Sequence, residues 1–130
     1  MFNGLQSDCL SITMGATYVT ANIIGPNAKT ETEFLIDTGS TFTWIPEDTL
    51  RKIGVQPSSK RKFKTIEGRE IERSVGEARL EAMGESATTI VVFGQKEDAI
   101  VLGAYSLEGL GLLVDPVTKK LRKIEAFIAY

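Results

Sequence analysis

The chain has 130 residues, of which 42% are hydrophobic and 25% are charged, and these values are typical of one globular domain over residues 1–130. Its 15 basic and 17 acidic residues give a net charge of -2, which argues against general binding of nucleic acid. The sequence contains no histidine and only one cysteine, Cys9. Histidine-dependent catalytic triads, histidine-bearing zinc sites and intrachain disulfide bonds are therefore excluded, and carboxylates must carry any acid–base chemistry.

The N-terminal segment has no basic region before an apolar run, and no run is long enough to span a membrane. We therefore expect no signal peptide, no membrane contact and a cytoplasmic location. We also expect no metal site and no cofactor. Cys9 is interpreted as a small buried apolar residue, because no histidine is present to activate it.

Short runs rich in Val, Ile, Thr and Phe, separated by turn residues, predict an all-β domain. The expected strands cover residues 9–14, 17–24, 32–37, 61–66, 69–82, 87–93, 99–102, 112–114 and 120–127. A short helix is predicted over residues 46–54, because Pro46 suits a helix start, acidic residues follow it, and Gly54 suits a stop. A second short helix is predicted over residues 104–111.

Residues 62–82 form a long predicted hairpin that turns at Glu67 and Gly68. The alternation of apolar residues changes phase at Gly76, which predicts a β-bulge there. The tip is too charged to belong to the core, so we expect it to stand out into solvent or to cover another feature. The basic stretch at residues 58–64 is interpreted as a solvated arm of this hairpin, next to acidic residues, rather than as a nucleic-acid patch.

An aspartate follows an apolar strand end in the stretch FLIDTGSTFTWIP, residues 34–46. Desolvating an ionised carboxylate costs several kcal/mol unless hydrogen bonds or a shared proton compensate. Asp37 is therefore either held by hydrogen bonds or used in chemistry. The simplest structural interpretation is an Asx-type turn after a strand.

The order Asp-Thr-Gly-Ser, three residues, Trp, an aliphatic residue and Pro, at residues 37–46, resembles the active-site segment of aspartic proteases. A second aliphatic run ends in glycine and precedes the second predicted helix, like the element that crosses behind the aspartate loop in this family. This second glycine element consists of Val101, Leu102 and Gly103. A single Asp-Thr-Gly in a short chain is similar to the retropepsin-like, retroviral-type proteases, whose subunits each supply half of a site.

The resemblance covers roughly residues 10–127 and implies an all-β, closed-barrel, retropepsin-like fold with one or two short helices. It also implies an aspartic endopeptidase that acts as a homodimer on peptide or protein substrates. Asp37 of each subunit would be catalytic, since two adjacent carboxylates that share one proton can activate water without a covalent intermediate.

The resemblance assigns roles to the residues that follow Asp37. Thr38 would bond to the opposite loop, and Gly39 would let the backbone turn sharply toward the carboxylates. Ser40 would bond to the outer oxygen of Asp37. Trp44 is interpreted as core support for this loop rather than as a substrate contact.

The hairpin tip would be the flap that covers the substrate, with contacts from Ile66, Glu67, Gly68 and Arg69. The sequence departs from the retroviral pattern at two places. The tip carries one glycine where retroviral flaps are usually glycine-rich. Ala104 follows Gly103 where an arginine commonly braces the dimer.

Two interpretations from other classes stay open at this point. One is a catalytically silent module with the same fold, which holds an extended peptide by strand addition under the hairpin. The other is a small structural β domain in which Asp37 only forms a turn. Cleavage of a denatured protein distinguishes the enzyme from both.

Overall fold

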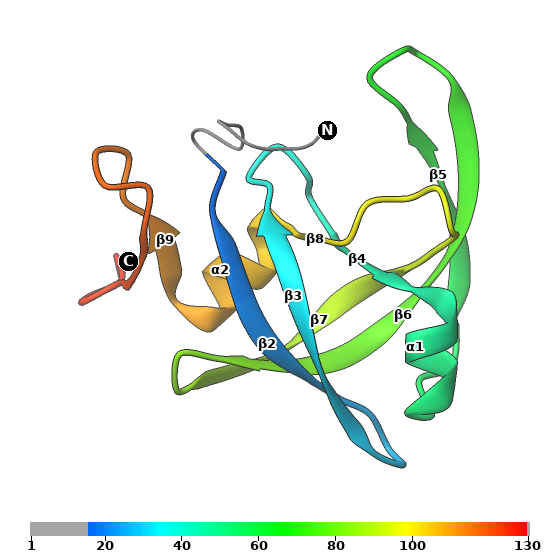
Figure 1. Cartoon of the computed structure of the whole chain (residues 1–130), viewed down its shortest axis with the longest axis horizontal. Helices are drawn as coiled ribbons and strands as arrows, with labels where there is room; N and C mark the ends of the chain where they lie inside the picture. The colour runs from blue at the N-terminus through cyan, green and yellow to red at the C-terminus, as the bar shows by residue number, and fades with distance from the viewer. Residues whose placement is uncertain (1–15, 130) are drawn as a thin grey trace.

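The computed structural model describes residues 16–129 of the chain (Figure 1). The elements in chain order are β2 (Tyr18–Ile24), β3 (Lys29–Ile36), β4 (Thr43–Pro46), α1 (Glu47–Lys52), β5 (Ser59–Lys64), β6 (Glu70–Ala82), β7 (Glu85–Gly94), β8 (Val101–Leu102), α2 (Ala104–Leu110), β9 (Leu112–Val114) and β10 (Leu121–Lys123). Strands predominate and both helices are short, so the predicted all-β class is confirmed.

The main sheet closes on itself around a single core. Its strand order is β2-β3-β8-β4-β7-β6-β5, and β2 also pairs with β6, so the run from β2 to β6 returns to its first strand. β9 and β10 form a separate two-stranded sheet. The core is apolar and receives side chains from the strands and both helices. Its largest fully buried apolar members are Phe34, Phe93, Ile23, Ile45, Leu50, Leu80, Leu102, Val91 and Val92.

Most predicted strands are present with small shifts at their ends, but β4 was missed. β4 is only four residues long, too short to show a strand alternation, although it lies in the sheet between β7 and β8. The predicted strand over residues 120–127 is shorter in the structure, where β10 ends at Lys123. The predicted strand over residues 9–14, and Cys9 with it, lies outside the described residues.

The predicted bulge at Gly76 is wrong. The pairing of β6 with β7 is uninterrupted at Gly76, whose partner is Val91. The change of phase instead marks the point where β6 leaves β5, with which it pairs only as far as Val75. A side chain at position 76 would lie 2.7 Å from the carbonyl oxygen of Gln56, so this position needs glycine because two backbone segments approach closely.

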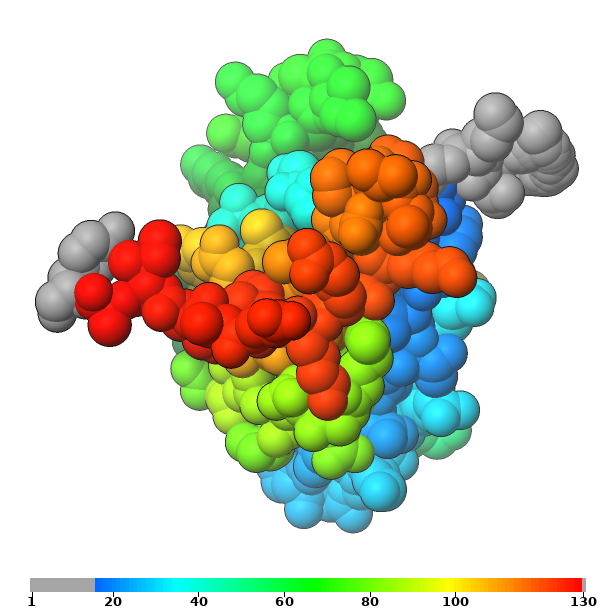
Figure 2. Space-filling view, turned by 90° about the vertical axis from the view of Figure 1, so that its left-hand side faces the viewer, coloured from blue at the N-terminus to red at the C-terminus, as the bar shows by residue number. Residues whose placement is uncertain are grey.

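β5 and the first part of β6 form a hairpin that stands out from the rest of the molecule (green in Figures 1 and 2). At its turn, the Thr65 N–H donates to the Arg69 carbonyl at 2.8 Å, and the Gly68 N–H donates to the Thr65 carbonyl at 2.9 Å. Gly68 has φ +88°, a region that favours glycine. Ile66 is fully exposed at the tip. The tip therefore lies outside the core, as predicted.

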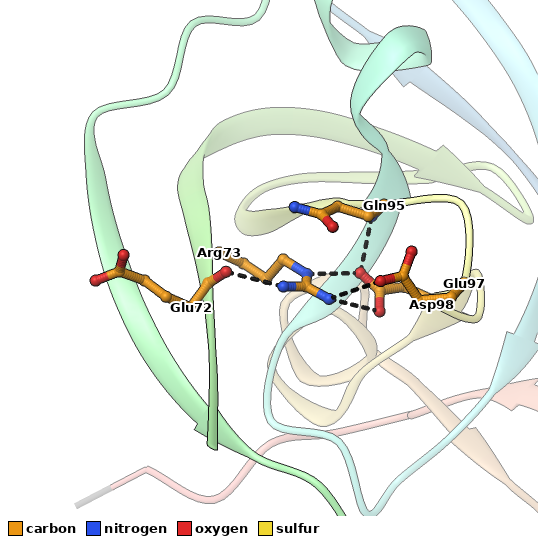
Figure 3. Close-up of polar contacts among 5 residues, drawn as sticks. All are labelled: Glu72, Arg73, Gln95, Glu97 and Asp98. Atoms are coloured by element: carbon orange, nitrogen blue, oxygen red, sulfur yellow. Dashed lines mark hydrogen bonds and ion pairs between the residues drawn. The ribbon is translucent and has the colours of Figure 1, made fainter. Parts of the chain in front are cut away.

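A buried ion pair attaches the base of this hairpin to the loop before β8 (Figure 3). Arg73 of β6 donates to both carboxylate oxygens of Asp98, from Nε at 2.7 Å and from Nη2 at 3.1 Å. The Gln95 N–H donates to the same carboxylate at 2.8 Å. The side chains of Arg73 and Asp98 are only 8% and 11% exposed, so this two-pronged contact is shielded from water.

These contacts change the pKa of Asp98. Burial raises the pKa of this carboxyl, but the hydrogen bonds from Arg73 and from the Gln95 N–H outweigh burial and hold the pKa below its usual value. A carboxyl whose pKa is depressed by folding stabilises the fold fully above its unfolded pKa, which is about 3.9 for Asp. That stabilisation is lost as the pH falls through the lower, folded pKa.

We predict that Asp98→Ala lowers the free energy of unfolding by about 3–5 kcal/mol near neutral pH, because the Arg73 guanidinium stays buried without its partner. Chemical denaturation measures this change. The difference from the parent should shrink in acid, where the parent also loses the ionised carboxylate. The matched control is Glu97→Ala, because the Glu97 side chain is 66% exposed and 3.7 Å from Arg73. It should cost under about 1 kcal/mol, and equal losses in the two variants would contradict the role of Asp98.

Candidate active site

Asp37 lies directly after β3, in a tight turn held by hydrogen bonds. Its N–H donates to the carbonyl of Leu102 at 3.0 Å, which ties the first residue of the loop to β8. The Gly39 N–H donates to Asp37 Oδ1 at 3.0 Å, the bond of an Asx turn, and the Ser40 N–H donates to the Asp37 carbonyl at 3.1 Å. Within residues 16–129, Oδ2 has no donor. The turn therefore fixes one carboxylate oxygen, and the residue as a whole is exposed to solvent.

The residues after Asp37 only partly match their expected roles. Gly39 directs its N–H to the carboxylate, as a close backbone approach requires. The expected bond from the Ser40 hydroxyl to the Asp37 carboxylate is wrong: this hydroxyl donates to the carbonyl of Phe42 at 2.7 Å. A short hydroxyl side chain readily bonds to backbone two residues along in such a turn. Thr38 is exposed in the single chain, so its bond to a second loop stays a prediction.

The second glycine element packs against the Asp37 loop. β8 pairs in parallel with the end of β3. The Ala104 N–H, at the start of α2, donates to the Ser40 carbonyl at 2.7 Å. A side chain at Gly103 would come within 2.4 Å of the carbonyl oxygen of Phe42, so only glycine allows this contact. The structure thus brings together two segments about half the chain apart in sequence, as the resemblance implied.

A buried group of hydroxyls lies beneath this contact. Thr43 Oγ1 accepts a hydrogen bond from the Gly103 N–H at 3.0 Å and shares another with the hydroxyl of Ser106. Ser106 in turn bonds to the hydroxyl of Thr89 at 3.0 Å. Thr43 and Ser106 are fully buried, so these bonds satisfy groups that water cannot reach. Sequence reasoning missed them, because the only signal was a threonine in alternation with the buried Ile45.

A groove of about 640 Å³ opens beside the loop, between the residues after Thr38 and the arm of the hairpin. Aromatic side chains from three segments meet there. The ring of Phe63 lies edge-on to Trp44, with centroids 5.0 Å apart, and Phe42 contacts both Phe63 at 6.3 Å and Tyr105 at 5.8 Å. Trp44 is half-buried and lines the groove, so it is more than the core support that we expected. The lining residues are Gly39, Ser40, Thr41, Phe42, Trp44, Arg61, Lys62, Phe63 and Lys64.

The expected flap residues are distant from Asp37 in the sequence. They occupy the exposed tip of the hairpin. Glu67 is held at the turn, where hydrogen bonds from its own backbone N–H and from Thr65 lower the pKa of its carboxyl.

No group of three or more His, Cys, Asp or Glu side chains among residues 16–129 is placed to hold a metal ion. No helix in the same part of the chain is long and apolar enough to cross a membrane.

The Asp-Thr-Gly turn is thus locked against a second strand-to-glycine element on a closed β sheet. The sequence matches the profile of the aspartyl protease family over residues 19–105. This match covers more than half of the chain, so the chain belongs to the aspartyl protease family. No curated protein matches the sequence at a significant level.

Solved structures of foamy virus proteins share the fold. The solution structure of the simian foamy virus (mac) protease is 25% identical, with a TM-score of 0.52 over 70% of this chain and 91% of that one. A foamy viral protease-reverse transcriptase in complex with an RNA/DNA hybrid is 20% identical, with a TM-score of 0.57 over 72% of this chain and only 12% of that one. These similarities confirm the predicted retropepsin-like fold.

We predict that Thr43→Val lowers the free energy of unfolding by about 1–3 kcal/mol, because it preserves the side-chain shape but leaves the buried Gly103 N–H without an acceptor. Chemical denaturation measures the loss. Thr89→Val serves as the control, because it removes a hydroxyl from the same group without touching that N–H. A loss for Thr43→Val no larger than that for Thr89→Val would show that the bond to Gly103 adds nothing.

Proposed function

We propose that the protein is an aspartic endopeptidase whose active site is shared by two subunits, each of which supplies Asp37. Membership of the aspartyl protease family supports the class of reaction. The observation that carries the proposal is the state of Asp37, an exposed residue whose carboxylate is oriented by one backbone N–H and whose Oδ2 meets no donor within residues 16–129. A carboxylate oxygen without an internal donor can bind water and exchange a proton with it, as general acid–base catalysis requires.

The proposed chemistry follows from placing two such carboxylates side by side. Two carboxyl groups within hydrogen-bonding distance of each other cannot both ionise readily, so the pair holds one proton. The ionised carboxylate accepts a proton from water as the water oxygen attacks the peptide carbonyl carbon, and the protonated one donates to the carbonyl oxygen. The carboxyl that took the proton from water then passes it to the nitrogen, and the other carboxylate takes a proton from a hydroxyl of the tetrahedral intermediate as the C–N bond breaks, which restores the shared proton. No covalent intermediate with the protein forms.

The sequence supports a shared site, because Asp37 is its only aspartate in an Asp-Thr-Gly or Asp-Ser-Gly context. We predict that the monomer is inactive and that specific activity rises with protein concentration in step with the fraction of dimer. Sedimentation at the assay concentrations, beside a cleavage assay, tests this expectation. A fully active species that sediments as a monomer would rule out the shared site.

The hairpin is proposed as the flap of this enzyme, with its tip at Ile66, Glu67, Gly68 and Arg69. Its β5 arm lines the same groove as the residues after Thr38, which supports this assignment. Ile66 is a large apolar side chain that is fully exposed in the single chain. Covering such a side chain is favourable, so a bound peptide beneath the tip would gain contact with it.

We predict that Asp37→Asn abolishes cleavage of a denatured protein such as casein while the dimer stays folded. A general acid or base typically contributes a factor of about 100 to 10,000, and the substitution removes both carboxylates of the pair. Thermal melts near neutral pH should show the variant at least as stable as the parent, because two repelling carboxylates are replaced by amides. The gain should shrink in acid, where the parent pair becomes protonated.

Three outcomes of this experiment separate the alternatives. Retained cleavage by the Asp37→Asn variant would contradict the protease proposal. Lost cleavage together with unfolding would mean that Asp37 mainly holds its turn. Peptide binding by a parent protein that cleaves nothing would identify a silent peptide-binding module.

A further inference from the structure

The groove beside the Asp37 loop is lined by cationic and aromatic side chains, with no acidic residue among them. This is unusual for a chain whose net charge is -2. Three of its lining residues are cations from a single strand, β5: Arg61, Lys62 and Lys64. A groove lined by one sign of charge attracts ligands of the opposite sign.

Arg61 differs from the two lysines in having no acidic neighbour across the hairpin. Lys62 and Lys64 lie opposite Glu72 and Glu70 in the β5–β6 register. Arg61 instead lies opposite Arg73, a like-charge pairing that is unfavourable unless other groups compensate.

An acidic side chain neutralises the charge of Arg73 but not that of Arg61. Asp98 neutralises Arg73 at 2.7 Å, whereas Arg61 makes no ion pair within residues 16–129.

The guanidinium of Arg61 is nevertheless held in place. Its central carbon lies 5.5 Å from the centroid of the Phe42 ring, in the loop that follows Asp37. A cation–π contact of this kind orients the group and leaves its N–H donors free. Arg61 lies on the same face of β5 as Phe63, since strand side chains alternate, and Phe63 contacts the aromatic cluster of the groove.

We propose that Arg61 is a specificity-determining residue that selects an acidic side chain in the substrate, and this inference rests on the proposed endopeptidase function. A guanidinium offers two parallel N–H donors that match a carboxylate, and lysine does not. The rings of Phe42, Trp44 and Phe63 supply apolar surface for the stem of the bound side chain. Because each subunit of the proposed dimer has one such groove, the preference should occur on both sides of the cleaved bond.

The test uses the full-length protein and peptides that are identical except for Glu, Gln or Lys at one position flanking the cleaved bond. At one position or more, kcat/KM should be about five- to tenfold higher for Glu than for Gln, and the preference should weaken at high salt. Arg61→Ala should abolish the preference, and Arg61→Glu should reverse it in favour of Lys. The control is Lys60→Glu, which makes the same charge change at the neighbouring exposed residue, opposite Ser74 and not among the residues that line the groove, and should keep the preference for Glu.

Binding provides a measurement that does not require cleavage. Trp44 is the only tryptophan of the chain and lines the groove, so its fluorescence reports occupancy in the Asp37→Asn protein. Glu peptides should bind this protein more tightly than Gln peptides, and Arg61→Ala in the same background should remove the difference. Cleavage with no preference for Glu, or a preference that survives Arg61→Ala, would overturn the role of Arg61 and leave the protease proposal intact. Tighter binding of Glu peptides by a parent that cleaves nothing would overturn the protease proposal alone.

Discussion

The geometry of the site depends on the close approach of two backbone segments, the turn after β3 and the end of β8. The Asp37 N–H reaches the Leu102 carbonyl, and Gly103 passes so close to Phe42 that any side chain there would collide with a carbonyl oxygen. This contact fixes the position of the Asp37 backbone, from which the carboxylate side chain projects. It also sets the start of α2 and the position of one wall of the groove, because the residues of that wall follow directly from the same turn.

The loop is held within one subunit by backbone bonds and buried hydroxyls rather than by a charged side chain. Ala104 stands where the resembled enzymes commonly carry an arginine, yet its N–H still bonds to the Ser40 carbonyl. Below it, Thr43 and Ser106 satisfy each other and the Gly103 N–H away from water. Such a neutral network orients the turn without placing a second charge beside the carboxylate, so the surroundings leave the chemistry of Asp37 to its partner across the proposed dimer.

Sequence reasoning recovered the features that local chemistry determines. Alternating apolar runs located most strands, and the Asp-Thr-Gly turn and the second glycine element were identified from residue types and order. It failed where contacts between residues far apart in the sequence determine the structure. β4 is too short to show an alternation of apolar residues. Glycine is required at position 76 by the nearby backbone of Gln56 rather than by the strand in which it lies. The groove could not be anticipated, because Phe42 and Phe63 come from separate segments and alternation does not tell which faces meet.

The ion pair at the base of the hairpin also controls repulsion between its two strands. Arg61 and Arg73 are partners in the register of β5 and β6, and the charges on Asp98 and, more weakly, Glu97 offset this opposition. When acid protonates these carboxyls, two arginines that are partners in the register lose their compensating charge at the point where the hairpin leaves the closed sheet. Acidification would then push the strands apart at their root, while the hydrogen bonds that close the turn at Thr65 are unaffected. The hairpin would loosen from its attachment outward, and its tip would swing as a preformed unit.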